Sequence, residues 1–206
     1  MKPSEIFRSK FHNKNGFYNI MPISNLASVL KYGILSNELA ERIPHRSVAM
    51  SIIQDRRDQV LIPNGLMLHQ YANLYIDARN PMLYKRKDED VIVLKVDCRI
   101  LDLPDVVVSD QNASSSYVRF YEPEEAMNKL DFNMIFARSW ESDNQFEYWR
   151  KKSAKCAEVL VPGKIEPSYV IAAAVKNDAD KERIIALGFD KRIYVNGDLF
   201  FGKEVE

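Results

Sequence analysis

One acid and two arginines, far apart in the sequence, are the residues of this chain that could do chemistry together. Glu158 stands directly before the apolar run 159–161, and Arg56 and Arg57 stand near the end of a predicted helix. The apolar run predicts a strand of the core. A carboxylate beside it cannot go deep without a partner, because burying an unpaired charge is costly. We therefore expect Glu158 at the edge of this strand, facing a cleft.

The two residue types suit the binding of a dinucleotide and the stabilisation of a sugar cation. A guanidinium such as that of Arg57 holds phosphate oxygens through two hydrogen bonds and stays charged. A fixed carboxylate near a ribose stabilises the positive charge that develops there, and it can deprotonate an acceptor. Each residue also has an ordinary interpretation. Arg57 can be a solvated cation at a helix end, and Glu158 can be a surface acid paired with Lys155.

Three further places carry polar or aromatic groups that could form a site. Tyr18 and Asn19 lie in a predicted strand, where an amide can pair with a carboxamide and a ring can stack. His69 precedes another strand and could be a structural residue. Trp149 is followed by cations at 150–152, as in sites for single-stranded nucleic acid. A solvated helix face anchored by one tryptophan explains that last pattern equally well.

The elements that must position these residues are short strands mixed with helices. Without a sustained alternation of strand and helix, this order predicts an α+β fold rather than a doubly wound sheet. Residues 1–15 are polar and basic and predict a loosely held arm, and Gly33 predicts the end of a helix. Strands are predicted at 17–20, 34–35, 72–76, 91–96, 106–108, 159–161 and 169–175. Helices are predicted between a cap at Ser24 and a stop at Gly33, and at 47–59, 81–84, 122–136 and 178–187, with a hairpin at 193–195 and 199–201.

Composition limits the class of protein. A chain of 206 residues fits one domain, 1–206, and 29 basic residues balance 29 acidic ones, which argues against a uniformly basic surface. The two cysteines and three histidines are spread singly, so no metal site is expected. No apolar run approaches the length of a membrane span, and the N-terminus lacks the apolar core of a signal peptide. We expect a cytoplasmic protein that does not contact a membrane.

The order of the segments resembles the DarT family of DNA ADP-ribosyltransferase toxins. The resemblance runs from about residue 17 to residue 201. The segments that carry it are 17–26, 34–36, 46–50, 54–57, 68–75, 80–84 and 155–161.

This resemblance implies the ADP-ribosyltransferase fold, a split mixed or antiparallel β-sheet core with flanking helices and a central NAD+ cleft. It implies transfer of ADP-ribose from NAD+ to a DNA base, with release of nicotinamide. By motif position, Glu158 is the catalytic acid, and Arg57 holds the NAD+ phosphates and helps to stabilise the transition state. The residues implied for NAD+ binding are Tyr18, Asn19, Met21, Asn25, Leu35, Ser36, Arg46, Arg57, His69, Tyr71 and Tyr75.

One departure from the commoner family pattern concerns the base. This chain has Asn19 where a histidine is usual and Met21-Pro22 where a Thr-His pair is usual. That version resembles the branch that modifies guanine rather than thymine. We expect a single-stranded DNA substrate, because extruding a base from a duplex costs about a few kcal/mol. The residues expected to contact DNA are Arg119, Arg138, Trp149, Arg150, Lys151 and Lys152.

Such toxins act with an antitoxin that removes ADP-ribose, of macrodomain or NADAR type, and we expect it to be a separate protein. Three alternatives remain open from the sequence. They are an NAD-dependent RNA 2′-phosphotransferase, an NAD+ glycohydrolase with water as the acceptor, and a non-catalytic nucleic-acid-binding module on the same fold.

Overall fold

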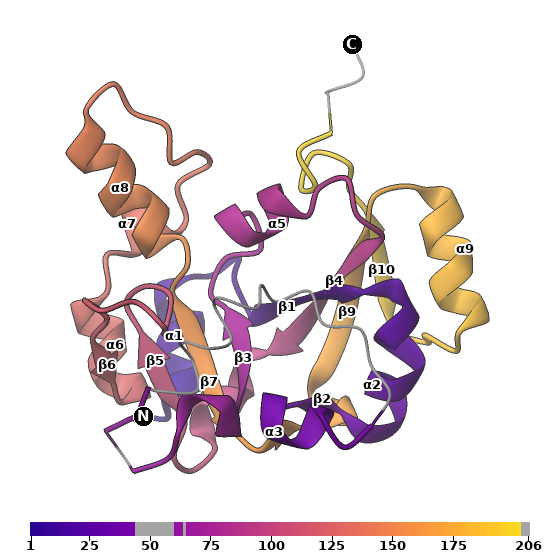
Figure 1. Ribbon diagram of the computed structural model, residues 1–206, viewed down its shortest axis with the longest axis horizontal. Coiled ribbons are helices and arrows are strands. Elements are labelled where there is room, and N and C mark those ends of the chain that lie inside the picture. The colour runs from indigo at the N-terminus through magenta and orange to yellow at the C-terminus, as the bar shows by residue number, and fades with distance from the viewer. Residues whose placement is uncertain (44–59, 64, 203–206) are drawn as a thin grey trace.

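The computed structural model of the chain describes residues 1–43, 60–63 and 65–202 and contains a central sheet flanked by helices (Figure 1). The strands are β1 Gly16–Pro22, β2 Ile34–Leu35, β3 Tyr71–Tyr75, β4 Val91–Asp97, β5 Val107–Ser109, β6 Phe120–Tyr121, β7 Glu158–Pro162, β8 Lys164–Ile165, β9 Val170–Val175 and β10 Arg192–Val195. The helices are α1 Pro3–Lys10, α2 Leu26–Tyr32, α3 Asn37–Ala40, α5 Pro81–Lys85, α6 Pro123–Lys129, α7 Phe132–Ile135, α8 Gln145–Ala154 and α9 Asp178–Ala186.

The main sheet is divided into two halves that meet at one residue pair. Its eight strands follow the order β10-β9-β4-β1-β3-β7-β5-β6, and β2 pairs with β8 in a separate small sheet. β1 pairs with β4 along its whole length, and β3 does the same with β7. Between the halves, β1 and β3 share only the pair of Tyr18 and Tyr75. This is the split core that the family resemblance implies, with mostly antiparallel strands and flanking helices.

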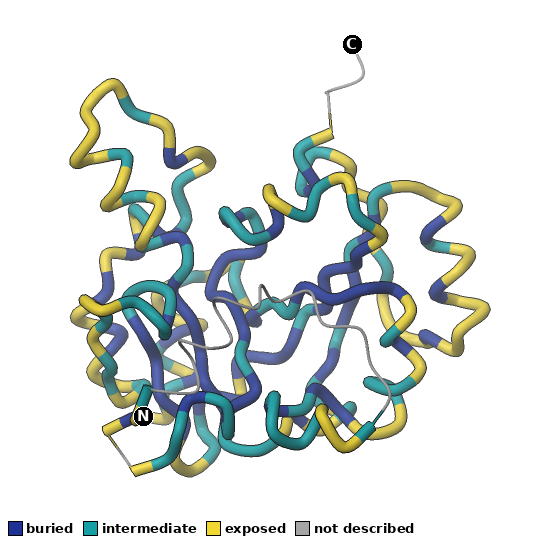
Figure 2. The backbone as a smooth tube through the Cα atoms, viewed as in Figure 1, coloured by how far each residue is buried: buried dark blue, intermediate teal, exposed yellow. Residues whose placement is uncertain are grey.

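The strand that carries Glu158 lies inside one half of the sheet. β7 has β3 on one side and β5 on the other, and its residues Val159, Leu160 and Val161 are buried. Val159 and Val161 belong to the main apolar core, whereas Leu160 packs in a smaller cluster on the other face. A strand covered on both faces needs a continuous apolar run, which is why the sequence pattern identifies it. Figure 2 shows the buried residues concentrated in these central strands.

The N-terminal segment is the first place where the structure differs from the sequence prediction. Residues 1–15 are not a loose arm, because Pro3–Lys10 forms α1. Phe7 is completely buried in the main core, and the ring of Phe7 lies 5.0 Å from that of Phe17. Ser4 donates its hydroxyl to Asp102 at 2.6 Å. Most of the polar and basic residues of this segment lie on the solvent-facing side of α1, and its few apolar residues pack against the core.

Two other elements differ from their predicted form. Residues 122–136 form two helices, α6 and α7, because the Asp131 carboxylate accepts the Met134 N–H at 3.1 Å and starts a new helix. The predicted hairpin at 193–201 is absent from the described chain. β10 instead pairs with β9 in parallel. Asn196 accepts the Leu199 N–H at 3.0 Å, and this bond closes a turn in place of the second strand.

Helix length bears on the membrane question. Within the ranges that the structure describes, we find no helix both long and apolar enough to cross a bilayer.

Gly33 ends α2 with a φ of +88°, as the sequence predicts.

Candidate active site

Glu158 is the first residue of β7, and its side chain is completely buried. Its place at the start of the strand agrees with the sequence prediction. Its complete burial differs from the expected exposure to a cleft, because the carboxylate has a hydrogen-bond partner. The carboxylate has a partner, because Oε1 accepts the Ala113 backbone N–H at 3.1 Å. The Glu158 backbone N–H donates to Ser109 Oγ at 3.1 Å. These bonds from β5 and the loop after it hold the acid in one place.

Lys155 is not the surface partner of Glu158 that the ordinary interpretation requires. Its side chain is completely buried, and Nζ lies 2.8 Å from Oδ2 of Asp77. The same ammonium donates to the carbonyl oxygens of Ile135 at 3.0 Å and Ala137 at 2.6 Å. The charge of Lys155 is therefore used inside the protein, at the start of the segment that leads into β7.

The negative charge of Glu158 affects a neighbouring thiol. Burial raises the pKa of the Cys156 thiol to about 12, and the charge of Glu158 adds to this increase. A raised pKa makes the Cys156 thiol a poorer nucleophile at neutral pH, because the reactive form is the thiolate. Among the described residues, no group of acids, histidines and cysteines is arranged to hold a metal ion.

A row of paired residues connects Glu158 to the split in the sheet. Tyr75 lies opposite Glu158 across β3 and β7, and Tyr18 lies opposite Tyr75 across β1 and β3. Directly paired residues point to the same face of a sheet. Two of the predicted NAD+-binding tyrosines therefore share a face with the predicted catalytic acid.

Asn19 and Met21 line the place where the two halves of the sheet separate. The Asn19 side chain donates Nδ2 to the Asn73 backbone oxygen at 3.3 Å and so connects β1 to β3 beyond their single residue pair. Met21 is buried in the main core. Asn25 ends the short turn Ile23–Asn25 that follows β1. The roles of these residues in binding NAD+ remain predictions.

A second group of predicted NAD+-binding residues lies at the other end of β3. Tyr71 opens that strand and is buried, and His69 belongs to the helical turn Leu68–Gln70 before it. Ser36 donates its N–H to the Gly163 oxygen at 2.7 Å, and its hydroxyl accepts the Leu39 N–H at 3.4 Å. Leu35 precedes it in β2. Within β3, Tyr71 lies four residues from Tyr75, a distance of about 14 Å along the strand.

Two predicted residues fall outside the described chain. Arg46 and Arg57, together with the helix predicted at 47–59, belong to the segment that the structure does not describe. The meeting of Arg57 with Glu158 across one pocket therefore remains a prediction.

Most of the predicted DNA contacts lie on α8, which ends four residues before Glu158. Trp149 is 64% exposed, Arg150 and Lys152 are exposed, and Lys151 pairs with Glu147 at 2.8 Å. Figures 1 and 2 show α8 as an exposed helix that stands away from the sheet. Two contacts come from elsewhere: Arg138 pairs with Asp198 at 3.1 Å, and Arg119 is an exposed residue before β6.

Sequence reasoning missed the residues that hold the acid in place. Ala113 and Ser109 act through a backbone N–H and a hydroxyl, which no side-chain pattern indicates. Asp77, the partner of Lys155, was missed as well. The sequence signal for Asp77 is its place directly after the predicted strand 72–76, just as Glu158 directly precedes a predicted strand.

Solved structures share the fold of this chain. The Thermosipho africanus DarTG structure in complex with ADP-ribose matches 91% of this chain and 51% of its own, with a TM-score of 0.78 and 28% identity. Thermus sp. 2.9 DarT in complex with ADP-ribosylated ssDNA matches 90% of this chain and 95% of its own, with a TM-score of 0.77 and 26% identity. The chain, with its split sheet, therefore has the ADP-ribosyltransferase fold.

Sequence comparison identifies the family. The model of the family described as "ssDNA thymidine ADP-ribosyltransferase, DarT" matches residues 18–201, so the chain belongs to the DarT family of DNA ADP-ribosyltransferases. A Thermosipho africanus protein, a "DNA ADP-ribosyl transferase-DNA ADP-ribosyl glycohydrolase fusion protein", is 33% identical over 171 residues. That match covers 78% of this chain but only 42% of the fusion protein. The family resemblance read from the sequence is confirmed.

Proposed function

We propose that this protein transfers ADP-ribose from NAD+ to a base of single-stranded DNA and releases nicotinamide. The observation that carries the proposal is the position of Glu158. It is buried, oriented by the Ala113 N–H, on the same sheet face as Tyr75 and Tyr18, and closely preceded by the exposed helix α8. The ADP-ribosylated ssDNA in the Thermus sp. 2.9 DarT structure supports the same reaction.

In this reaction the bond between the ribose anomeric carbon and nicotinamide breaks, and nicotinamide leaves with the bonding electrons. A nitrogen of the base then forms the new bond to that carbon and loses a proton. Glu158 stabilises the sugar cation and takes up the proton. A buried carboxylate fixed by a backbone N–H is suited to this role, because its charge is little screened and need not reorient. Arg57 holds the NAD+ phosphates in this proposal.

We assign binding of the DNA strand to the surface of α8 and its neighbours. An exposed tryptophan offers a face on which a base stacks, and exposed cations attract phosphates. Trp149, Arg150 and Lys152 supply these groups on one helix, immediately before the catalytic strand. We assign further contacts to Arg119, which is exposed before β6, and to Arg138, whose guanidinium also pairs with Asp198.

For the base, we propose guanine in preference to thymine. The support is the departure at Asn19 and Met21-Pro22 from the commoner pattern, although the family description names thymidine. We also propose that the protein is a cytoplasmic toxin whose antitoxin is a separate ADP-ribosyl hydrolase of NADAR or macrodomain type. The glycohydrolase part of the Thermosipho fusion protein supports this pairing.

Mass spectrometry of defined single-stranded oligonucleotides, incubated with NAD+ and the wild-type protein, tests the reaction and the base together. We expect a gain of one ADP-ribose, mapped by fragmentation to guanine, on strands that contain guanine. Modification of thymine alone would refute the guanine assignment and leave the reaction intact. Equal modification of duplex DNA would refute the preference for single strands. Release of nicotinamide that does not depend on DNA, with no adduct, would replace the transferase by a glycohydrolase.

A further inference from the structure

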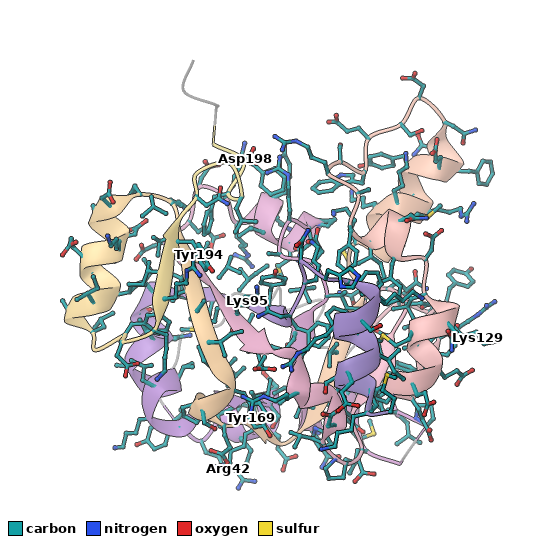
Figure 3. The ribbon with its side chains drawn as sticks, turned by 180° about the vertical axis from the view of Figure 1, so that it is seen from behind. Arg42, Lys95, Lys129, Tyr169, Tyr194 and Asp198 are labelled. Carbon is teal, nitrogen blue, oxygen red and sulfur yellow. The ribbon has the colours of Figure 1, made fainter. Side chains whose placement is uncertain are left out.

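A cationic cavity with two tyrosines lies on the first half of the sheet, apart from α8. It has a volume of about 270 Å³ and is lined by residues of β1, β4, β9 and β10 and of the turn after β10. A cavity of this size holds a single small group rather than a dinucleotide. Figure 3 shows Lys95 and Tyr194 in this region of the sheet, with Asp198 above them and Lys129 at the right-hand edge of the view.

The cavity has an excess of positive charge. Lys95 is half-buried, and within the described ranges its ammonium makes no hydrogen bond or ion pair. Burial lowers the pKa of Lys95, and the neighbouring cations Lys14 and Arg192 lower it further. Asp77 is the acid that lines the cavity, and it is already bound by Lys155 at 2.8 Å and lies 3.6 Å from Lys14. A half-buried ammonium such as that of Lys95, with no carboxylate of the described chain bound to it, is suited to bind an anionic group of a ligand.

An aromatic wall accompanies these cations. Tyr194 is 40% exposed at the mouth of the cavity, and the Arg192 guanidinium lies 4.7 Å from the centre of its ring. Tyr18 lines the cavity from β1. An open ring beside cations binds a base and its phosphate together, since every base has a face that can stack.

The pairing of the strands places this cavity in register with the catalytic acid. Lys95 lies opposite Tyr18, Tyr18 opposite Tyr75, and Tyr75 opposite Glu158. The four residues form one row across β4, β1, β3 and β7 and share a face of the sheet. Three strand spacings separate Lys95 from Glu158, about 14 Å. That distance places the cavity beyond the reacting base but within reach of the same DNA strand.

We propose that this cavity binds a phosphate of the single-stranded DNA substrate, with the adjoining nucleoside stacked on Tyr194, next to the nucleotide whose base reaches Glu158. The inference rests on the proposed function and adds a second DNA-contacting surface to that of α8. The other source of phosphate is NAD+ itself. The open aromatic mouth and the small volume favour a strand that continues into solvent.

The test compares Lys95→Gln with Lys191→Gln, which removes the same charge from an exposed residue beside β10 that pairs only with Asp190 among the described residues. Binding of a fluorescent single-stranded oligonucleotide is measured from low to moderate salt, together with KM values for oligonucleotide and NAD+. We expect Lys95→Gln to weaken DNA binding about five- to tenfold and to reduce the salt slope by about 0.7, the value for one phosphate contact on a single strand. Tyr194→Ala should weaken binding with an unchanged slope, and Lys191→Gln should match the wild type.

Equal DNA affinity and slope for Lys95→Gln and wild type would overturn the inference. A raised KM for NAD+ with unchanged DNA binding would also overturn it and assign the cavity to the NAD+ phosphates. Thermal unfolding checks that each variant is folded. A wild-type protein that transfers no ADP-ribose to any oligonucleotide would refute the proposed function itself, whereas a wild-type-like Lys95→Gln in an active enzyme refutes only the cavity.

Discussion

The ammonium of Lys155 lies 2.8 Å from the carboxylate of Asp77, and the Lys155 side chain is completely buried. Asp77 follows β3, and Lys155 stands three residues before Glu158. The further bonds from Lys155 to the Ile135 and Ala137 oxygens connect the segment after α7 to the same point. The ion pair therefore holds together the end of β3, the segment that follows α7, and the residues that lead from α8 into β7.

We predict that Asp77→Asn destabilises the protein strongly. Loss of the acid leaves a buried ammonium without its counter-charge, which costs about 3–5 kcal/mol in the free energy of unfolding. The double variant with Lys155→Met should lose less than the sum of the two single changes, because it removes both charges. Urea unfolding measures all three free energies. Lys164→Met, which breaks the exposed pair with Glu166, is the control and should cost less than about 1 kcal/mol. Additive effects of the two buried changes would show that the pair is not a unit.

We predict that Glu158→Gln abolishes transfer without unfolding the protein. The amide oxygen can still accept the Ala113 N–H, but it can neither stabilise a cation by charge nor take up a proton. The rate of transfer should fall about 10²- to 10⁴-fold, the range for loss of a general acid or base. Single-turnover transfer to an oligonucleotide measures the rate, and thermal unfolding checks the fold. Glu166→Gln is the matched control, since its side chain is 52% exposed. Activity within a few-fold of the wild type would remove Glu158 from catalysis.

We predict that Trp149→Ala weakens binding of single-stranded DNA more than any single lysine change on α8. Loss of one stacked base costs about 1–3 kcal/mol, roughly a 5- to 150-fold change in affinity. Lys151→Ala should have a smaller effect, because Glu147 already pairs with that ammonium at 2.8 Å. Fluorescence anisotropy with a labelled oligonucleotide compares the two. If Lys151→Ala weakened binding more than Trp149→Ala, the surface would bind DNA by charge and not by stacking.

The sequence predicts the local elements well and the distant contacts poorly. An unbroken apolar run identifies β7, and the left-handed preference of glycine identifies the end of α2 at Gly33, because both signals are local. Pairings between segments far apart in the chain leave no such signal. The sequence therefore predicts a hairpin at Asn196-Gly197, whereas in the structure β10 pairs in parallel with β9.

The candidate site divides in the same way. The family resemblance selects Glu158, but the burial of its carboxylate depends on Ala113, 45 residues away. The structure likewise assigns the Lys155 ammonium to Asp77, whereas proximity in sequence suggested Glu158. Which partner a charge finds depends on the packing of segments, and no composition or spacing rule contains that information.

We predict that Gly33→Ala is one of the most damaging single-methyl additions in the chain. Gly33 has a φ of +88°, and an added Cβ would lie 2.2 Å from the Ile165 backbone oxygen. Backbone strain of about 1 kcal/mol adds to this clash with a neighbouring strand that cannot move freely. Thermal unfolding should show a large loss. Gly65→Ala is the informative control, since Gly65 also has a positive φ but an added Cβ meets no atom of the described residues within 4 Å. Similar losses for both variants would attribute the effect to φ alone.

We predict that Tyr18 makes the stability of the protein fall in alkaline solution. Burial raises the pKa of Tyr18 to about 12, and the charge of Asp77 adds to the increase. An unfolded tyrosine ionises near pH 10, so the folded state retains the proton over a range in which the unfolded state has lost it. The corresponding stability, about 2–3 kcal/mol, is fully present below pH 10 and is lost as the pH rises towards 12. Tyr18→Phe removes this dependence.

The measurement is the free energy of unfolding of the wild type and Tyr18→Phe from pH 8 to the highest pH at which both remain folded. Below pH 10 the difference between the two proteins should be constant. Above it, the wild type should lose stability relative to the variant, because only the wild-type unfolded state gains the ionised ring. Tyr117→Phe, at a ring that is 87% exposed, is the matched control and should follow the wild type. A constant difference between Tyr18→Phe and wild type across the whole range would mean that the Tyr18 hydroxyl meets water in the folded protein.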